Sequence, residues 1–328
     1  MAALDATKQT LLDIAKRTDP SGKTAEIVEI LNETNNLDAM PYKECNQKTT
    51  ELITQRTGLP TTYYRMINQG TPSSKSTTAQ ITEGSAMLSS RSNVDVRLAR
   101  LNSDVNAYRR SEAIPHLQAM GETHATTLFY GAAADTEQFV GFSNRYNDTS
   151  ANNGQNIIDV GGTGSDNSSI WLIGWGFNTV YGVYPEGSMA GLRHTDLGED
   201  DVDDADSNPY RAYKDMFEFD AGLALKDWRY CVRAANIDIS TLIADDTGAT
   251  TGLINTMVKM IHRIPTRSGI NLQFYCNRTI AEMLDVQSLN KSNVDLKVGG
   301  EEGKEKLMLR GISINTVDAL TEAEAQVT

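Results

Sequence analysis

Residue types that build cross-linked or metal-bound scaffolds are scarce in this chain. Its 328 residues include three cysteines, Cys45, Cys231 and Cys276, which are widely spaced and form no CxxC pair. This spacing argues against a disulfide framework and against a cysteine zinc site. We therefore expect three buried free thiols.

Long apolar runs and long basic runs are also missing. No run approaches the roughly 18 apolar residues that indicate a membrane-spanning helix. The N-terminal residues mix acids and bases and lack a signal-peptide core, so we expect a cytoplasmic chain with no membrane partner. The formal net charge is −13, which makes a phosphate-binding surface a poor candidate.

Motifs of catalysis are missing as well. SGKT at 21–24 lacks the leading glycine and preceding strand of a phosphate-binding loop, and GGTG at 161–164 is not followed by GK[ST]. No GxSxG nucleophile elbow occurs. The histidines lie outside any HExxH pattern; they are His116, His124, His194 and His262. We therefore expect no catalytic, cofactor-binding or metal-binding residue, and no enzyme activity.

A long helix from Ser103 to Gly131 is the element around which the rest is organised. Asn102 or Ser103 can cap its start and Gly131 its end, while Pro115 predicts a kink or a break. At 1.5 Å per residue it would run about 40 Å, so it is either a large core helix or a strut. Its apolar face repeats at three- and four-residue steps, through Leu117, Met120, His124 and Leu128.

The residues before this helix are polar, with few apolar anchors. Two short amphipathic helices are expected at 3–18 and 23–33, and 34–58 is typical of an arm that lies across another surface. Weak strands near 61–68 and 76–83 flank a polar turn, which predicts a protruding ribbon. Two strands alone are marginal in water, so such a ribbon needs a neighbour.

The residues after the helix mix strands and helices without a regular alternation, which indicates the α+β class. The first elements expected are buried strands over 168–185 turning at Phe177-Asn178, a hairpin over 192–220, and a strand pair or bent strand over 222–236. A helix over 251–263, a strand over 270–276 and a helix from Asn277 to about Leu289 are expected to follow. A polar loop or turn over 291–304 then leads to a closing strand over 307–317 with a bulge at Gly311.

Two clusters in this half have both a structural and a functional interpretation. Trp171 and Trp175 could stack on a ligand, although core packing is favoured because no catalytic polar residue accompanies them. The carboxylates at 196–206 fail the EF-hand pattern and indicate a solvated acidic loop or a loose cation site. Four arginines near the long helix are expected to form surface ion pairs; they are Arg97, Arg100, Arg109 and Arg110.

Four segments carry a resemblance to a known family. They are TGLPTTYYRMINQGTPSSKSTTAQITEGSAMLSSRSNVD, SIWLIGWGFNTVYGVYPEGSMAGL, FEFDAGLALKDWRYCVRAANID and LRGISINTVDAL. From about Asn32 to Leu320 the chain resembles the major capsid (coat) proteins of tailed bacteriophages, of the short-tailed epsilon-fifteen-like type.

The resemblance implies an α+β fold of the Hong Kong 97 type. It also implies a division into an N-terminal arm (1–58), an extended E-loop (59–95), a peripheral domain (96–131 and 291–328) containing the spine helix 103–131, and an axial domain (132–290). The last strand is then expected to return to the peripheral sheet.

The function implied is that of a structural coat protein. It would self-assemble into hexamers and pentamers of an icosahedral capsid that encloses double-stranded DNA without sequence-specific binding. Implied partners are further copies of the chain, a small cementing or decoration protein, a scaffolding protein and a portal. The implied location is the virion capsid, with assembly in the bacterial host cytoplasm.

Two alternatives belong to other classes. One is a non-viral α+β enzyme or carbohydrate-binding protein whose site is the tryptophan pair and the acidic loop. The other is an encapsulin-like compartment shell, which would share the fold.

Overall fold

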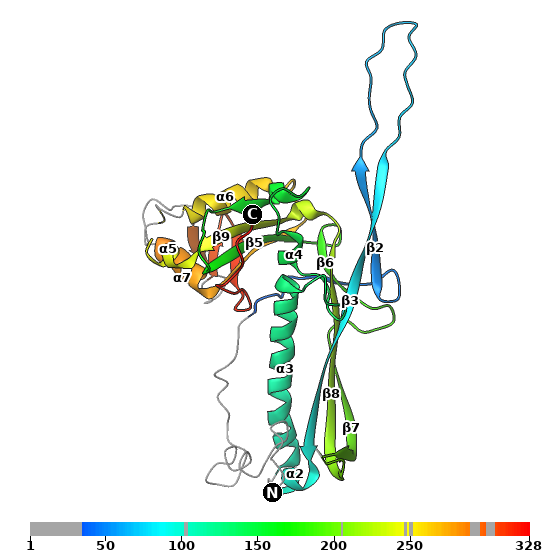
Figure 1. Ribbon diagram of the computed structural model, residues 1–328, viewed down its shortest axis with the longest axis vertical. Coiled ribbons are helices and arrows are strands. Elements are labelled where there is room, and N and C mark those ends of the chain that lie inside the picture. Colours follow the sequence, from blue (N-terminus) through cyan, green and yellow to red (C-terminus); the bar gives the residue numbers. More distant parts are fainter. Residues whose placement is uncertain are drawn as a thin grey trace.

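The computed structural model describes residues 35–101, 104–204, 206–245, 248, 252–288, 296–299 and 306–328. A globular part lies at one end of the long helix α3, and an elongated part runs beside α3 and continues past the globular part as a hairpin (Figure 1). The helices expected at 3–18 and 23–33 lie outside the described residues.

The globular part is built around β5 (Asn167–Trp175), all of whose residues are buried. Strands β9 (Cys231–Asp238) and β10 (Asn271–Cys276) pair with it in antiparallel fashion. Alternate side chains of a strand point to opposite faces, so Leu172 joins one core cluster and Trp171 the other. Both faces of β5 are covered, which explains the continuous apolar run from Ile170 to Trp175.

Three helices cover one face of this sheet: α5 (Ile239–Ile243), α6 (Leu253–Arg263) and α7 (Arg278–Ser288). Helix α6 buries an apolar stripe at helical spacing, which confirms the helix expected there. Asn277 caps α7 as expected, because its Oδ1 accepts a hydrogen bond from the Thr279 backbone N–H at 2.9 Å.

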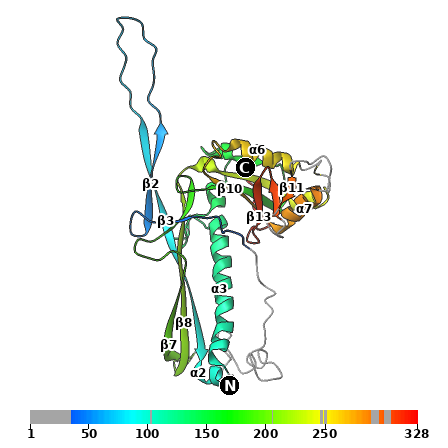
Figure 2. The same ribbon diagram turned by 180° about the vertical axis from the view of Figure 1, so that it is seen from behind.

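The last turn of α3 and the short helix α4 (Phe142–Arg145) cover the opposite face. Phe129 and Phe142 lie against the buried Trp171 ring, with centroids 6.1 and 5.8 Å away. The long helix therefore ends inside the core of the globular part, while its first turns lie far from it (Figure 2).

Helix α3 spans Val105–Tyr130 and runs unbroken through Pro115, so the expected break is wrong. Pro115 lies on the exposed side of the helix, where water can replace the missing hydrogen bond. Asp104 is the N-cap in place of Asn102 or Ser103, since its carboxylate accepts two backbone hydrogen bonds at 2.9 and 3.1 Å. A separate short helix, α2 (Val96–Leu101), precedes it.

A three-stranded antiparallel sheet runs beside α3. It consists of β3 (Thr77–Asp95), β8 (Pro209–Leu225) and β7 (Leu192–Asp203), with β8 in the middle. The β7–β8 hairpin turns at 204–208 as expected. Strand β6 (Val180–Tyr184) joins β8 to the globular part, and β1 (Tyr42–Glu44) pairs with β6.

The protruding hairpin is made by β2 (Thr50–Gly58) and the first half of β3. The strand predicted near 61–68 is wrong, because residues 59–76 contain no strand. The pairing begins earlier in the chain, at Thr50, where apolar and polar residues alternate.

The C-terminal strands differ from the single closing strand that was expected. Strands β12 (Lys306–Leu309) and β13 (Ile312–Thr316) form a tight hairpin, and β11 (Leu296–Gly299) pairs with β12. Arg310 and Gly311 have φ values of 51° and 81°, the left-handed conformations of a two-residue turn. β13 pairs with β10, so the last strand lies in the globular part and does not return to the sheet beside α3.

Three short elements complete the globular part. They are β4 (Ile157–Asp159), which pairs with β9, and the 3-10 helices η1 (Gly154–Asn156) and η2 (Trp228–Tyr230). None of the described helices is long and apolar enough to span a membrane.

Candidate assembly surface

The loop that joins β2 to β3, residues 59–76, is called the loop tip here; it lies at the far end of the hairpin (Figure 1). It carries two cations, Arg65 and Lys75, and no acidic residue. Large apolar side chains concentrated this far from a core mark a surface that contacts another molecule. Five such side chains are exposed on it, namely Leu59, Tyr63, Tyr64, Met66 and Ile67.

A buried ion pair fastens the hairpin to the globular part. Glu83 of β3 is 6% exposed, and Arg145 of α4 donates to both of its carboxylate oxygens at 2.5 and 2.7 Å. Such two-fold contacts between guanidinium and carboxylate are directional as well as strong. This contact therefore joins β3 of the hairpin to α4 of the globular part.

A second buried carboxylate, Glu51, fastens the other strand. It accepts hydrogen bonds from the Lys43 ammonium at 2.8 Å, the Asn46 backbone N–H at 2.7 Å and the Tyr181 hydroxyl at 3.0 Å. Burial alone would raise the pKa of Glu51, but these three donors outweigh it and lower the pKa below its usual value.

Charged contacts join α3 to the sheet beside it. Asp215 of β8 is 5% exposed, and its carboxylate accepts two hydrogen bonds from Arg109 of α3, at 2.8 and 3.2 Å. The Nε2 atom of His194, on β7, lies 2.9 Å from the same carboxylate. Arg109 also donates to Asp196 at 2.7 Å, and this hydrogen bond lowers the pKa of that carboxyl. The predicted ion pair of Arg109 is confirmed, although it is far less exposed than expected.

Histidines fill the rest of this interface. The rings of His116 and His194 both stack on the ring of Phe217, with centroids 6.1 and 4.8 Å from it. Farther along α3, the Nε2 atom of His124 lies 3.2 Å from the Tyr42 hydroxyl. Burial lowers the pKa of His124 to about 4, so this ring is neutral at physiological pH.

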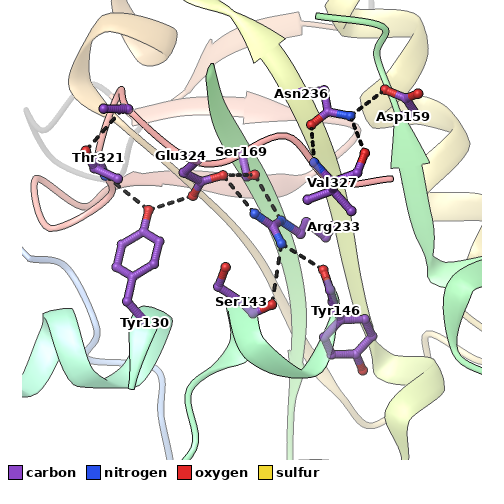
Figure 3. A network of polar contacts seen from close by, with 11 residues as sticks. Tyr130, Ser143, Tyr146, Asp159, Ser169, Arg233, Asn236, Thr321, Glu324 and Val327 are labelled. Carbon is purple, nitrogen blue, oxygen red and sulfur yellow. Dashed lines mark hydrogen bonds and ion pairs between the residues drawn. The ribbon is translucent and has the colours of Figure 1, made fainter. Parts of the chain in front are cut away.

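A buried polar network ties the C-terminal residues to the end of α3 (Figure 3). Arg233 of β9 donates to Glu324 at 2.8 Å, and the Tyr130 hydroxyl donates to the other oxygen of that carboxylate at 2.6 Å. The Ser169 hydroxyl donates to Glu324 and accepts from Arg233, which also donates to the Tyr146 carbonyl at 2.7 Å.

Asn236 holds the next turn of the same segment (Figure 3). Its amide exchanges two hydrogen bonds with the backbone of Val327, both 2.8 Å long, and donates to Asp159 at 2.9 Å. The C-terminal segment is thus anchored to the globular part by the buried residues Glu324 and Val327.

The structure places the two clusters that were singled out in the sequence. Trp171 and Trp175 are 0% and 2% exposed inside the core, which confirms the core interpretation. Within the described residues, no group of three or more His, Cys, Asp or Glu side chains that could hold a metal ion occurs. All three cysteines are free and buried, as predicted.

The acidic residues expected in a solvated loop lie mostly on β7 itself. Asp200 binds Lys214 at 2.7 Å, and Glu199 is within 3.2 Å of Arg100 and 3.6 Å of Arg211. The loop prediction was wrong because cations on neighbouring elements, Arg100 of α2 and Arg211 and Lys214 of β8, pair with these carboxylates. The carboxylates can therefore line an exposed strand.

Sequence reasoning missed the two buried ion pairs. The pattern CVRAAN places Arg233 within an otherwise apolar strand, which was a signal for a buried cation in need of a partner. No sequence signal marks Glu83 or Glu324 among the many other carboxylates.

The family of the chain is shown by its similarity to known proteins. A family model described as major capsid protein GP7 matches residues 19–328. The chain belongs to the GP7 major capsid protein family. No curated protein matches it.

Solved structures similar to this GP7-family protein include coats of several kinds. A structure of bacteriophage Epsilon15 has 32% sequence identity and a TM-score of 0.82, and the match covers 100% of this chain and 99% of that one. The SrpI encapsulin of Synechococcus elongatus has 10% identity and a TM-score of 0.47, covering 70% and 96%. The capsid of a native GTA particle has 10% identity and a TM-score of 0.45, covering 71% and 99%.

The GP7-family protein is therefore a structural coat protein with an α+β fold of the Hong Kong 97 type, and not an enzyme. It associates with itself in the capsid lattice and is located in the virion capsid. The alternative of a sugar-binding protein built on the tryptophan pair is wrong, since both rings lie inside the core.

Proposed function

We propose that this coat protein uses its loop tip to bind neighbouring copies in hexamers and pentamers of an icosahedral shell. The exposed apolar side chains of residues 59–76 carry this proposal, because the described part of the chain leaves them uncovered. Burial of such side chains is worth about 25 cal/mol per Å² of apolar area, which a monomer does not gain.

We further propose that the globular part is the axial domain and that α3 with β7 and β8 is the peripheral domain. The pairing of β7 with β8 beside α3 supports assigning 192–225 to the peripheral domain. The network around Glu324 supports assigning 306–328 to the axial domain. Residues 1–58 remain proposed as the N-terminal arm and 59–95 as the E-loop.

The cargo proposed for the shell is double-stranded DNA, held without sequence-specific contacts. A net charge of −13 supports this, because an acidic wall repels the phosphate backbone and leaves the packed DNA free. A decoration protein, a scaffolding protein and a portal are proposed as further partners. Assembly is proposed to take place in the cytoplasm of the bacterial host.

Sedimentation and electron microscopy of the purified chain test the proposal. We expect closed particles, or rings in which five or six copies are counted in class averages. A chain that stays monomeric at every concentration and salt condition that assembles other coat proteins would contradict it.

A further inference from the structure

The loop between β4 and β5, residues 160–166, is folded against the junction of β9 and α5, and we call it the GGTG loop. Two backbone hydrogen bonds fasten it there. The Gly162 N–H donates to the Asn236 carbonyl at 2.9 Å, and the Ile239 N–H donates to the Asp166 carbonyl at 3.0 Å. Glycine-rich segments have little conformational preference of their own, so these contacts determine where the loop lies.

Two carboxylates, Asp166 and Asp238, lie at this junction, and the protein holds one oxygen of each. The Oδ2 atom of Asp166 accepts hydrogen bonds from the backbone N–H of Ser240, at 3.1 Å, and from its hydroxyl. The Oδ1 atom of Asp238 caps α5 by accepting from the Thr241 backbone N–H at 2.7 Å. Within the described residues, neither carboxylate forms an ion pair, and the second oxygen of each accepts no hydrogen bond.

These two second oxygens border the same side of Gly164. A β-carbon at Gly164 would lie 2.5 Å from Oδ1 of Asp166 and 3.4 Å from Oδ2 of Asp238. The hydrogen bonds from Ser240 lower the pKa of Asp166, so this carboxylate is charged at physiological pH. Neighbouring carboxylates repel each other, and a bound cation removes that repulsion.

A third oxygen, Oδ1 of Asn167, lies at the same junction. Asn167 is 0% exposed, and this oxygen has no hydrogen-bond partner among the described residues. Asn167 is directly opposite Asp238 in the pairing of β5 with β9, so both side chains point to the same face of the sheet. A β-carbon at Gly162 would lie 2.8 Å from Oδ1 of Asn167 and 3.0 Å from the Asp238 β-carbon. Buried acceptors are normally bound by protein, water or an ion, so this oxygen indicates a ligand independently of the carboxylates.

The three atoms are all oxygens, which are the ligands that calcium prefers. Ca²⁺ takes about six to eight of them, from carboxylates, amide and backbone carbonyls and water. Only two of the three come from Asp or Glu, which agrees with the lack of any group of three His, Cys, Asp or Glu ligands in the described part of the chain. Zinc prefers nitrogen and sulfur, and Mg²⁺ demands near-ideal octahedral geometry, so both fit this set less well.

We propose that Asp166, Asp238 and Asn167 bind one Ca²⁺ ion in each copy of the chain. Backbone carbonyls of the GGTG loop and water complete the coordination. The ion neutralises the two carboxylates and fastens the GGTG loop to the start of α5. This inference concerns the globular part of a single copy and does not depend on the proposed function.

Hydrogen exchange of the unaltered full chain, read by mass spectrometry, locates the ion. The chain is treated with EDTA, dialysed and then measured with and without CaCl₂. We expect Ca²⁺ to slow amide exchange in 160–168 and 238–242, and MgCl₂ to have a smaller effect. Protection of the acidic residues 196–203 alone would place the ion on β7 and overturn the inference. No change at up to about 10 mM Ca²⁺, above the dissociation constants of weak calcium sites, would also overturn it.

Three variants test the ligands by calorimetric titration with CaCl₂, after circular dichroism has shown that each is folded. Asp238→Asn keeps the cap, since Asn and Asp cap helices equally well, but removes a ligand charge. It should weaken Ca²⁺ binding at least about tenfold, because ligand charge tunes the affinity of calcium sites. Gly164→Ala leaves the charge unchanged and places a methyl group between the two oxygens. The φ of Gly164 is not positive, so alanine fits the backbone, and this variant should weaken binding as well.

Asp104→Asn is the matched control, because Asp104 is also a helix N-cap but lies at the start of α3. It should leave the Ca²⁺ affinity unchanged. Equal weakening by Asp104→Asn and Asp238→Asn would mean that Ca²⁺ responds to the overall negative charge of the chain, and the site assignment would fail. Full affinity in Gly164→Ala would likewise contradict the proposed position of the ion.

Discussion

Arg233 and Glu324 form an ion pair inside the protein, with 2.8 Å between Nη2 and Oε2 and side chains that are 2% and 4% exposed. The pair joins β9 to the last residues of the chain, and the Tyr130 hydroxyl extends it to the end of α3. The long helix, the central sheet and the C-terminal segment therefore meet at one carboxylate (Figure 3).

Removal of that charge should be costly. In Glu324→Gln the Arg233 guanidinium stays buried without a counter-charge, which typically lowers the free energy of unfolding by about 3–5 kcal/mol. Chemical denaturation followed by tryptophan fluorescence measures the loss. Glu218→Gln is the matched control, because its partner Arg193 is 56% exposed and surface pairs contribute about 0–1 kcal/mol. Equal losses in the two variants would show that the buried pair has no special role.

Acid should weaken the contact between α3 and the sheet through His124. Burial lowers its pKa from 6.5 to about 4, so between these values the unfolded chain binds more protons than the folded chain. Stability is therefore complete above pH 6.5 and falls as the pH drops toward 4, by at most about 3 kcal/mol.

His124→Gln removes this titration and should flatten the dependence of unfolding free energy on pH in that window. Tyr42, Phe139 and Phe219 surround the ring, so the variant will also lose some stability at neutral pH. The diagnostic quantity is the slope between pH 4 and 6.5. An unchanged slope would mean that other groups cause the acid sensitivity.

Carboxylates of the sheet beside α3 should contribute more to the free energy of unfolding when they are buried than when they are exposed. Asp215→Asn takes the counter-charge from Arg109 and should cost about 1.5–3 kcal/mol, since hydrogen bonds between charged groups are the strong ones. Asp200→Asn, on a residue whose side chain is 65% exposed, should cost less than about 1 kcal/mol. Thermal unfolding of both variants measures the difference, and a larger loss for Asp200→Asn would contradict this account.

Local pattern was sufficient to predict much of the fold. The apolar run of β5, the stripe of α6 and the Asn277 cap are determined by neighbouring residues, and each was predicted correctly. The closing strand was misjudged because a Gly in a strand also suits a bulge, and only the φ values of Arg310 and Gly311 distinguish a two-residue turn.

Long-range partners were not predictable in the same way. Glu83 pairs with Arg145 across 62 positions and Arg233 with Glu324 across 91, and nothing in the sequence separates these carboxylates from exposed ones. The assembly surface was partly predictable, because a polar ribbon without a core implied a neighbour. Its apolar tip was assigned to a strand near 61–68, which concealed the exposed side chains of 59–67.

The hairpin also shows where a loop can be shortened without damage. Replacement of 70–85 would remove Glu83 and its buried contact with Arg145, so it would test the core as well as the loop. Replacement of 60–75 by a short Gly-Ser linker leaves every residue of β2 and β3 in place.

The central claim, that the loop tip joins copies of this coat protein, is tested most directly by that 60–75 variant. Circular dichroism on the dissociated subunit and electron microscopy of the assembly reaction are performed on one preparation, beside the unaltered chain. We predict a melting temperature close to that of the unaltered chain together with a loss of closed shells. Normal shells from the shortened chain would contradict the account.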